Sequence, residues 1–254
     1  MGCVQSCFED DRCVLFRFED NGNCSTFCDT GMDKGVTPEY GSDANVTTAK
    51  AIGACPKPPA LPNGHVVYNS RRVNSVANYS CNEDFKFFGL SLMSVCDVTG
   101  SWNVLNGSCA RVAFYNVTLV FISLIPEIVR PGWKVEIFGT PLNESRMSFN
   151  LECGIVFVAL HFDVRFQHKS YRNIALRTSR TDGVKWDRRD VDQPYFPFAV
   201  GRPFNLTIQV TASGFDMYVD NDWHVFRNHS TDLTRIGRFI IKRGGVIQSV
   251  KFFN

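Results

Sequence analysis

The sequence predicts a mainly β protein built from three modules, and three observations support this prediction. From about residue 112 onward, short apolar runs of strand character alternate with turn residues, and no convincing ten-residue helical pattern interrupts them. Nine of the ten cysteines lie between Cys3 and Cys109, which indicates small disulfide-stapled modules ahead of a larger core. With 254 residues and 44% hydrophobic content, the chain can build one large core and one or two small modules.

The first module, residues 1–53, is defined by its cysteine spacing. Cys3, Cys7 and Cys13 precede a strand-like Val-Leu-Phe-Arg-Phe stretch, and Cys24 follows it. This spacing resembles the core of a PAN/apple domain, an α+β module in which a short helix is stapled to a strand. The resemblance implies the bridges Cys3–Cys24 and Cys7–Cys13.

The remaining cysteine of this module, Cys28, is then left over. We expect it to pair with sequence upstream of this chain or with another subunit. Cys24-x3-Cys28 could form half of a zinc site, but no second ligand pair at suitable spacing follows, so disulfide chemistry is favoured. Residues 29–54 are rich in Gly, Thr, Asp and Ser and predict a terminal strand and a linker.

The second module, residues 54–110, has a continuous series of landmarks. In order they are Cys55-Pro-Lys-Pro-Pro, Asn63-Gly64, Tyr79-Ser-Cys81, Phe88-Gly89, Cys96, Gly100-Ser-Trp102 and Cys109. The series resembles a sushi (complement control) module, and it implies the bridges Cys55–Cys96 and Cys81–Cys109. Such bridges are needed because a core of about 55 residues rarely supplies more than ~3–5 kcal/mol. We expect Trp102 to fill the core between them.

The third module, residues 112–254, reads as a two-sheet sandwich of short strands. The expected strands are Val135–Phe138, Ser148–Leu151, Ile155–His161, Leu206–Val210, Phe215–Val219 and Phe239–Lys242. Turns are expected at Ser213-Gly214 and at Asp220-Asn-Asp222.

This module contains a series of motifs in a fixed order. They are Ile125-Pro, Pro131-Gly-Trp-Lys-Val-Glu-Ile-Phe-Gly139, Phe149-Asn-Leu-Glu-Cys-Gly154, Ala159-Leu-His-Phe-Asp-Val-Arg-Phe166, Trp186, Phe196-Pro-Phe198, Gly201-Arg-Pro-Phe204 and Gly214-Phe215. The series resembles a galectin carbohydrate-recognition domain. The resemblance implies a jelly-roll sandwich that binds β-galactosides without metal, through a strand carrying His, Asn and Arg, a further Asn, a Trp and a Glu.

The strand His161-Phe-Asp-Val-Arg-Phe166 carries the main candidate site. Because successive strand side chains point to opposite faces, its aromatic and aliphatic residues can enter a core while His161, Asp163 and Arg165 stand together in water. His161 and Arg165 match the family's His and Arg. Asp163 stands where the family has Asn and Val164 where it has Pro, which weakens the expected sugar contact.

The loop after this strand supplies the other candidates. Trp186, in a polar turn-like setting, is the expected stacking platform for a galactose ring, whereas Trp133 and Trp223 are expected to be packing residues. The family's second Asn falls on Thr178, or on Arg177 by strict counting. Its Glu falls on Asp190 when counted from one side and on Arg189 when counted from the other.

Basic residues crowd the same region and suggest two alternatives. They form either a solvated loop, with some arginines paired to Asp182, Asp187, Asp190 and Asp192, or a site for sulfated or sialylated glycans, which arginine forks bind well. The residues are Arg172, Arg177, Arg180, Lys185, Arg188 and Arg189.

The expected compartment is extracellular, because paired cysteines coincide with Asn-x-Ser/Thr acceptors for N-glycosylation. The apolar run 117–129 is broken by Pro126 and Glu127 and is too short to span a bilayer. The Met1-Gly-Cys start fits a lipidation pattern, but the disulfide-rich front argues against a cytosolic anchor. We expect the chain to be the inner part of a longer precursor or an incomplete gene product. The acceptors are Asn23, Asn45, Asn78, Asn106, Asn116, Asn143, Asn205 and Asn228.

The sequence therefore favours a secreted glycan-binding protein that needs no cofactor or metal. Its expected partners are glycans on glycoproteins or glycolipids, with protein partners for the first two modules; a net charge of +2 gives no reason to expect nucleic acid. The alternative is a protein-interaction module whose galectin-like part no longer binds sugar. An Asp163/Asp190 glycosidase pair is disfavoured for want of any nucleophile motif. Cys153 is expected to be a free, strand-buried thiol.

Overall fold

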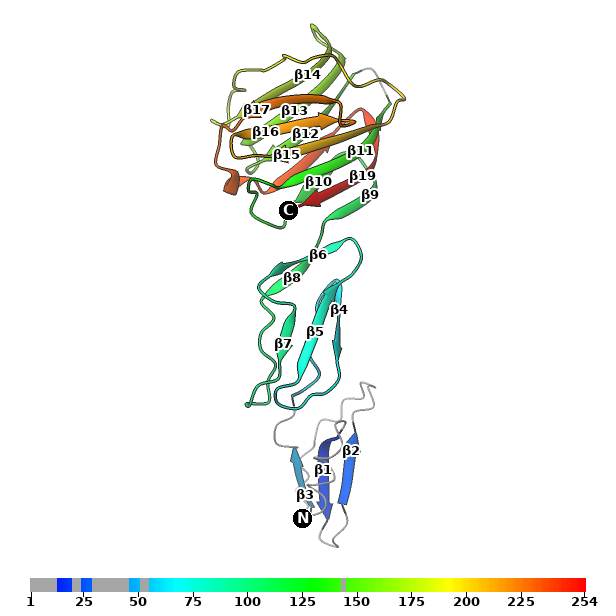
Figure 1. The fold of residues 1–254 in the computed structure, drawn as a ribbon, viewed down its shortest axis with the longest axis vertical. Coiled ribbons are helices and arrows are strands. Elements are labelled where there is room, and N and C mark those ends of the chain that lie inside the picture. Colours follow the sequence, from blue (N-terminus) through cyan, green and yellow to red (C-terminus); the bar gives the residue numbers. More distant parts are fainter. Residues whose placement is uncertain (1–12, 20–23, 29–45, 51–54, 143–144) are drawn as a thin grey trace. The chain divides into compact units, whose positions relative to one another are not determined.

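A computed structural model of the chain describes residues 13–19, 24–28, 46–50, 55–142 and 145–254, the first three ranges as strands only. The chain divides into two compact units (Figure 1). The first comprises Met1–Glu83 and Phe87–Cys109, and the second Asp84–Lys86 and Ala110–Asn254. In the described part of the chain, no helix has both the length and the apolar character needed to cross a membrane.

The N-terminal segment contributes a small antiparallel sheet. Its central strand β1 (Cys13–Glu19) lies between β2 (Cys24–Cys28) and β3 (Val46–Lys50). These strands coincide with the strand-like stretch after Cys13 and with the terminal strand expected within residues 29–54. The expected short helix and the side chains that would form the bridges Cys3–Cys24 and Cys7–Cys13, like the partner of Cys28, lie outside the described residues. The PAN/apple resemblance therefore stays a prediction.

The sushi-like part of the chain is an all-β module held by two disulfides. Both implied bridges, Cys55–Cys96 and Cys81–Cys109, are confirmed. Trp102 is buried, donates a hydrogen bond from Nε1 to the carbonyl oxygen of Pro56 at 2.7 Å, and so fills the core as expected. The strands are β4 (Gly64–Tyr68), β5 (Val76–Cys81) and β7 (Met93–Val95) in one sheet, with β6 (Phe85–Gly89) and β8 (Gly107–Arg111) in another.

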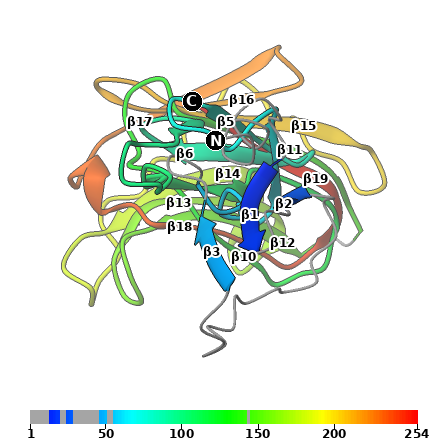
Figure 2. The ribbon, with the colours of Figure 1, turned by 90° about the horizontal axis from the view of Figure 1, so that it is seen from below.

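The second unit is a sandwich of two antiparallel sheets, as predicted (Figure 2). The five-stranded sheet has the order β10 (Phe121–Leu124), β18 (Arg238–Lys242), β12 (Arg146–Glu152), β13 (Val158–His168), β14 (Tyr171–Arg180). The six-stranded sheet has the order β17 (Trp223–Asn228), β16 (Gly214–Val219), β15 (Phe204–Val210), β11 (Lys134–Pro141), β19 (Gly245–Phe253), β9 (Ala113–Val117). One 3-10 turn, η1 (Leu233–Arg235), precedes β18.

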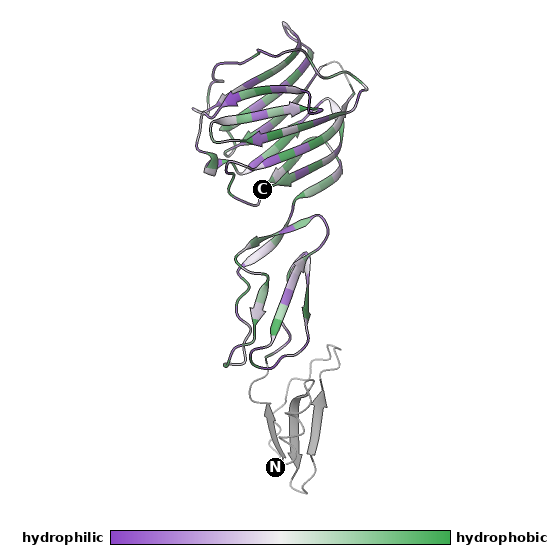
Figure 3. Ribbon diagram, viewed as in Figure 1, coloured by the Kyte–Doolittle hydropathy of each residue, from purple (hydrophilic) through white to green (hydrophobic). Residues whose placement is uncertain are grey.

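Strand alternation builds the core between these sheets. Polar and apolar residues alternate along most strands (Figure 3), so each sheet turns one apolar face inward. Phe149, Phe162 and Trp223 are fully buried, and the rings of Phe162 and Trp223 lie 6.2 Å apart across the sandwich. Trp133 is also fully buried, which confirms the packing role expected for Trp133 and Trp223.

The sandwich has more strands than predicted, since β9, β10, β14, β17 and β19 were not among the six expected, and several bounds differ. The strand expected at Ile155–His161 instead runs as β13 from Val158 to His168, because residues 153–157 form a bend in which the Cys153 N–H donates to the Phe157 carbonyl oxygen. The ten-residue strand β14 was not predicted. Its second half, Arg177–Arg180, is polar in sequence yet largely buried, so the hydrophobic pattern gave no strand signal there.

The expected turn at Asp220-Asn-Asp222 joins β16 to β17. Asp220 and Asn221 both have positive φ values, 52° and 60°, the backbone that a tight right-twisting hairpin requires and that Asp and Asn tolerate better than most residues. The hairpin places β17 at the edge of its sheet, where Arg227 faces the interior.

Candidate functional site

The outer face of the five-stranded sheet carries the candidate site. Cross-strand register places Asn150 opposite His161, Ser148 opposite Asp163, and Arg146 opposite Arg165. Phe162 and Val164, which alternate with these residues, are fully buried in the core. The predicted division of β13 into an apolar and a polar face is therefore confirmed.

Asp163 lies at the centre of this face and is fully buried rather than standing in water. Its Oδ2 accepts a hydrogen bond from Nε of Arg165 at 2.7 Å and lies 3.5 Å from Nη1 of Arg146. Nε2 of His161 is 3.6 Å from the same oxygen. The expectation that the three polar residues are equally solvated is wrong, because the two longer side chains and Arg146 close over the short carboxylate.

The charge environment keeps Asp163 ionised. Burial by itself raises the pKa of this carboxyl, but its contacts with His161 and with Arg165 outweigh burial, so the pKa lies below its usual range. Oδ1 is also buried and has no hydrogen-bond partner within the described residues. The carboxylate therefore acts as the fixed anion around which the surrounding cations are arranged.

His161 is oriented by a hydrogen bond to the neighbouring strand. Its Nδ1 lies 2.6 Å from Oδ1 of Asn150, which, as an amide oxygen, can only accept. Nδ1 therefore carries a proton, and this bond fixes the orientation of the ring, with Nε2 on the side of Asp163. The imidazole lies 4.6 Å from the ring of Trp186, centroid to centroid.

Arg165 is fixed by two contacts. Besides the bond from Nε to Asp163, its guanidinium carbon lies 4.8 Å above the ring of Tyr171, a cation–π contact. Within the described residues, no hydrogen bond engages either Nη group of Arg165. The two Nη groups therefore keep donors for a ligand.

Trp186 sits in the loop between β14 and β15 and is 39% exposed. The loop turns at Asp182, whose Oδ1 accepts backbone hydrogen bonds from Val184 and Lys185, each at 2.8 Å. These bonds lower the pKa of Asp182. The guanidinium carbon of Arg180 lies 5.1 Å from the Trp186 ring, so this aromatic is supported by His161 and Arg180 while part of it stays open to solvent.

Thr178 faces the same side as His161 but is not available to a ligand. It pairs with His161 in register, yet it is buried, and its hydroxyl donates to the carbonyl oxygen of Asp187 at 3.0 Å. Asp187 in turn accepts from the Ser179 hydroxyl at 2.6 Å. Thr178 therefore anchors the loop that carries Trp186, which corrects the expectation of a sugar contact at this position.

Two buried arginines hold the same loop from the inside: Arg177, for which pairing with a loop aspartate was one of the alternatives, and Arg227, which sequence reasoning missed. Nη2 of Arg177 donates to Oδ1 of Asp192 at 2.7 Å, and Nη1 of Arg227, from the other sheet, donates to Oδ2 of Asp190 at 2.6 Å. Burial lowers the pKa of Arg177, and the nearby Asp192 and Asp190 oppose that shift. Strand alternation could have revealed Arg227, since it shares an inward face with Trp223 and Val225.

Asp190 therefore belongs to the interior edge of the sandwich and not to the polar face. Its backbone forms a bridge with Arg177, and its other carboxylate oxygen lies 3.3 Å from Nε of Arg188. Asp163 is held by a separate set of cations, so the two carboxylates do not form the glycosidase pair considered above. Within the described residues, no group of three His, Cys, Asp or Glu side chains is arranged to hold a metal ion.

Three of the six basic residues of this region are engaged within the protein, which favours the alternative of a solvated loop with some arginines paired to aspartates. Arg177 pairs with Asp192 and Arg188 with Asp190, while Arg180 donates to the carbonyl oxygen of Val156.

Comparisons with known proteins agree with this architecture. Residues 120–252 match the family model described as galactoside-binding lectin, which covers more than half of the chain. The chain belongs to the galactoside-binding lectin family. A second match, over residues 55–109, is to the sushi (SCR) repeat. The family is one of lectins, not of enzymes.

Individual relatives of this lectin cover its second unit. Human Galectin-7 is 35% identical over 138 residues, which is 52% of this chain and 95% of that protein. The galactose-binding lectin l-1 of Anguilla japonica is 28% identical over 111 residues, 43% of this chain and 77% of that protein. Among solved structures, a galectin of Caenorhabditis elegans aligns with a TM-score of 0.49 and 19% identity, covering 56% of this chain and 96% of that one.

The lectin unit brings His161, Asp163, Arg165 and Trp186 together, places Thr178 beneath the loop, and turns Asp190 away. Sequence reasoning missed Arg146 as a residue of this face, because its position opposite Arg165 follows only from the strand register. Cys153 is free, as expected, but it is half-buried just beyond β12 and not within a strand, and burial raises its pKa.

We predict that Asp163→Asn lowers the unfolding free energy of the lectin unit by about 1–3 kcal/mol at pH 7, because Arg165 and Arg146 lose their anion. Since the pKa of Asp163 is lower in the folded state, its ionisation contributes stability above the unfolded pKa of about 3.9, which is lost as pH falls through the folded value. Urea unfolding of both proteins from pH 7 to pH 2 measures this. If the difference in unfolding free energy between the two proteins does not shrink in acid, the ionised state assigned to Asp163 is contradicted.

We further predict that Arg227→Met loosens the Trp186 loop by leaving Asp190 without its buried partner. Amide hydrogen exchange should accelerate at Asp187 and Asp190, whose N–H groups donate to the carbonyl oxygens of Ser179 and Arg177. Arg188→Met is the matched control, because the Arg188 side chain is 91% exposed and its contact with Asp190 is longer. Equal protection in both variants would show that Arg227 does not hold the loop.

Proposed function

We propose that this protein is an extracellular lectin that binds a β-galactoside, or an acidic derivative of one, on the outer face of the five-stranded sheet. The observation that carries the proposal is the grouping of His161, Arg165 and Trp186 around the buried carboxylate of Asp163. A galactose ring needs one flat aromatic for its apolar face and directed partners for its hydroxyls. This face offers both.

Each residue has a distinct role in the proposed complex. Trp186 stacks on the apolar face of the sugar ring, and the His161 ring forms a hydrogen bond with a ring hydroxyl. The Nη groups of Arg165 donate to hydroxyl or ring oxygens. Asp163 contacts the sugar little, since it is fully buried; it positions Arg165 and His161 so that neither must be ordered when the ligand binds.

The proposed preference for acidic glycans rests on the polar face and not on the basic loop. Arg146 and Arg165 together carry two positive charges near the single carboxylate of Asp163, which leaves an excess positive charge at this end of the face. A sulfate or carboxylate substituent would find guanidinium donors there. The arginines of the loop contribute less, because Arg177 and Arg188 are paired with aspartates.

The extracellular location is supported by the two disulfides of the sushi-like part. We propose that the sushi-like part acts as a spacer or contacts other proteins. The alternative function, protein interaction without sugar binding, would require the same of it. The two functions, lectin and interaction module, therefore differ only in whether a glycan is bound.

We predict that Trp186→Ala lowers the affinity for galactosides roughly 5–13-fold on a glycan array, because the stacking contact of roughly 1–1.5 kcal/mol is lost. Tyr115→Ala is the control for the removal of an exposed aromatic, since Tyr115 lies on β9 of the other sheet. If the wild-type protein binds no glycan on the array, the result would favour the interaction-only function.

We also predict that Arg146→Met weakens binding of sulfated or sialylated galactosides while binding of lactose changes little. The acidic ligands should lose roughly 3–10-fold in affinity as salt rises from about 50 to 500 mM, because exposed charge contacts are screened. Arg189→Met serves as the control for removing a loop charge. If salt has no effect on acidic ligands, electrostatic selection on this face is excluded.

A further inference from the structure

The six-stranded sheet carries several glycosylation sequons of the lectin unit. Asn116 lies on β9, Asn205 on β15 and Asn228 at the end of β17, and all three side chains are exposed. Within the described part of the five-stranded sheet, no asparagine begins an Asn-x-Ser/Thr triplet. Modification at these sequons would therefore leave the face of His161 uncovered.

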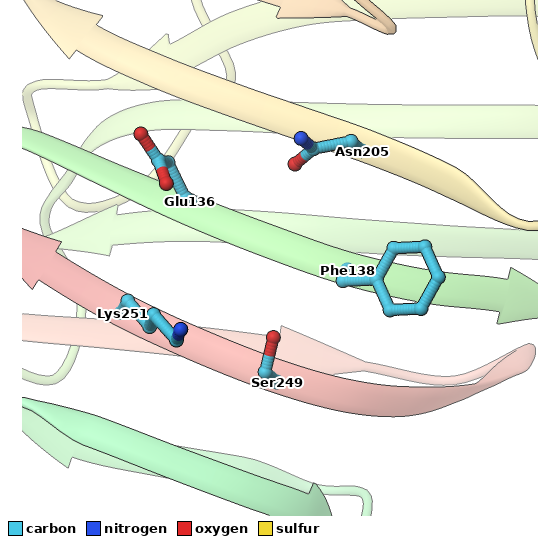
Figure 4. A pocket seen from close by; sticks show the side chains of 5 residues that line it. All are labelled: Glu136, Phe138, Asn205, Ser249 and Lys251. Atoms are coloured by element: carbon cyan, nitrogen blue, oxygen red, sulfur yellow. The ribbon is translucent and has the colours of Figure 1, made fainter. Parts of the chain in front are cut away.

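Asn205 has surroundings that suit a sugar residue. It pairs in register with Phe138, which in turn pairs with Ser249, so these three side chains form one row across β15, β11 and β19. Thr207, the third sequon residue, begins a parallel row with Glu136 and Lys251. Figure 4 shows the side chains of Asn205 and Phe138 standing next to each other on the outer face of this sheet.

The two rows enclose a shallow hollow of about 190 Å³, lined by Asn205, Phe138, Glu136, Ser249 and Lys251. This volume is below the ~300–1,000 Å³ of sites that capture free ligands. A tethered sugar has no such requirement, because covalent attachment gives it a high effective concentration at the hollow. A single sugar ring linked to Asn205 is thus a better occupant than a diffusing ligand.

Phe138 supplies the apolar floor. Its side chain is 43% exposed in the middle of a sheet, flanked by polar neighbours. Glu136 is held by Lys134 at 2.7 Å, and Lys251 lies 5.6 Å from the ring of Tyr115, so both charges are drawn toward other partners. The side-chain amide of Asn205 makes no hydrogen bond to any described residue, although its backbone N–H donates to Asp220.

We propose that Asn205 carries an N-linked glycan whose first N-acetylglucosamine packs on Phe138. In the transfer step, Nδ2 of Asn205 bonds to the anomeric carbon of a lipid-diphosphate-linked oligosaccharide, the bond from that carbon to the diphosphate oxygen breaks, and the Nδ2 proton passes to a base. The lipid diphosphate is the leaving group. The proposal rests on the extracellular part of the proposed function, because the donor belongs to the secretory pathway.

Attachment precedes folding, so the folded sheet needs only to keep the amide in solvent. Asn205 and Thr207 meet this condition because the two-residue spacing of a strand places both on the outer face. Packing of the sugar on Phe138 then removes an exposed aromatic from water, which stabilises the sheet.

Occupancy is tested on the full chain secreted from cultured eukaryotic cells behind a cleavable signal peptide. Peptide mass spectrometry after enzymatic release of glycans in heavy-oxygen water should mark Asn205 in the wild type and in Thr207→Ser. It should leave Asn205 unmarked in Thr207→Ala, which keeps the asparagine but removes the sequon. An unmarked Asn205 in the wild type would overturn the modification.

Packing of the sugar on Phe138 is tested by a double-mutant cycle, in which the melting temperatures of four proteins are compared. Enzymatic trimming to a single N-acetylglucosamine is compared with the aglycosylated Asn205→Gln protein, each with Phe138 and with Phe138→Ala. We expect the sugar to raise the melting temperature by roughly 2–4 °C when Phe138 is present and by almost nothing in Phe138→Ala. An equal shift in both backgrounds would overturn the packing while leaving occupancy intact.

Galactoside binding by the Asn205→Gln variant distinguishes a failure of the glycosylation proposal from a failure of the lectin proposal. Binding should equal that of the wild type, since the modification lies on the sheet opposite to the His161 face. Binding lost with the glycan would overturn the assignment of the two faces, and glycosylation without any galactoside binding would overturn the lectin function alone.

Discussion

The polar face of the lectin unit depends on one buried negative charge, the carboxylate of Asp163. A buried ion without partners is strongly unfavourable, so its presence requires the cations that surround it. Arg165 donates to it directly, and Arg146 and His161 approach the same oxygen within 3.6 Å. The positions of these three side chains on the polar face are thus set by a residue that is itself inaccessible.

A second set of charges holds the aromatic side of the site. Arg177 and Arg227 are buried at the edge where the two sheets meet, and each binds an aspartate of the loop that presents Trp186. Because Arg227 belongs to the six-stranded sheet, the loop is tied to both layers of the sandwich. The polar face therefore depends on contacts made on the opposite side of β14.

Much of this organisation could be predicted from sequence where the signal is local. The resemblance to a sushi module implied the bridges Cys55–Cys96 and Cys81–Cys109, and the two faces of β13 follow from alternation. Prediction failed at β14, where Thr178 and Arg177 are polar but buried. It failed again at Asp190, because counting along a loop cannot say on which side of a sheet a side chain ends.

The sequence by itself determined the sushi and lectin module types, the sandwich class and the strand that carries His161 and Arg165. The strand properties depend on a periodicity that acts over a few residues, whereas the two bridges of the sushi-like part were implied by its resemblance to a family. Only the tertiary structure decided that Asp163 is buried, that Arg146 joins it, and that Asp190 faces Arg227. Burial and ion pairing depend on strand register and on contacts between the sheets, which join residues far apart in the chain.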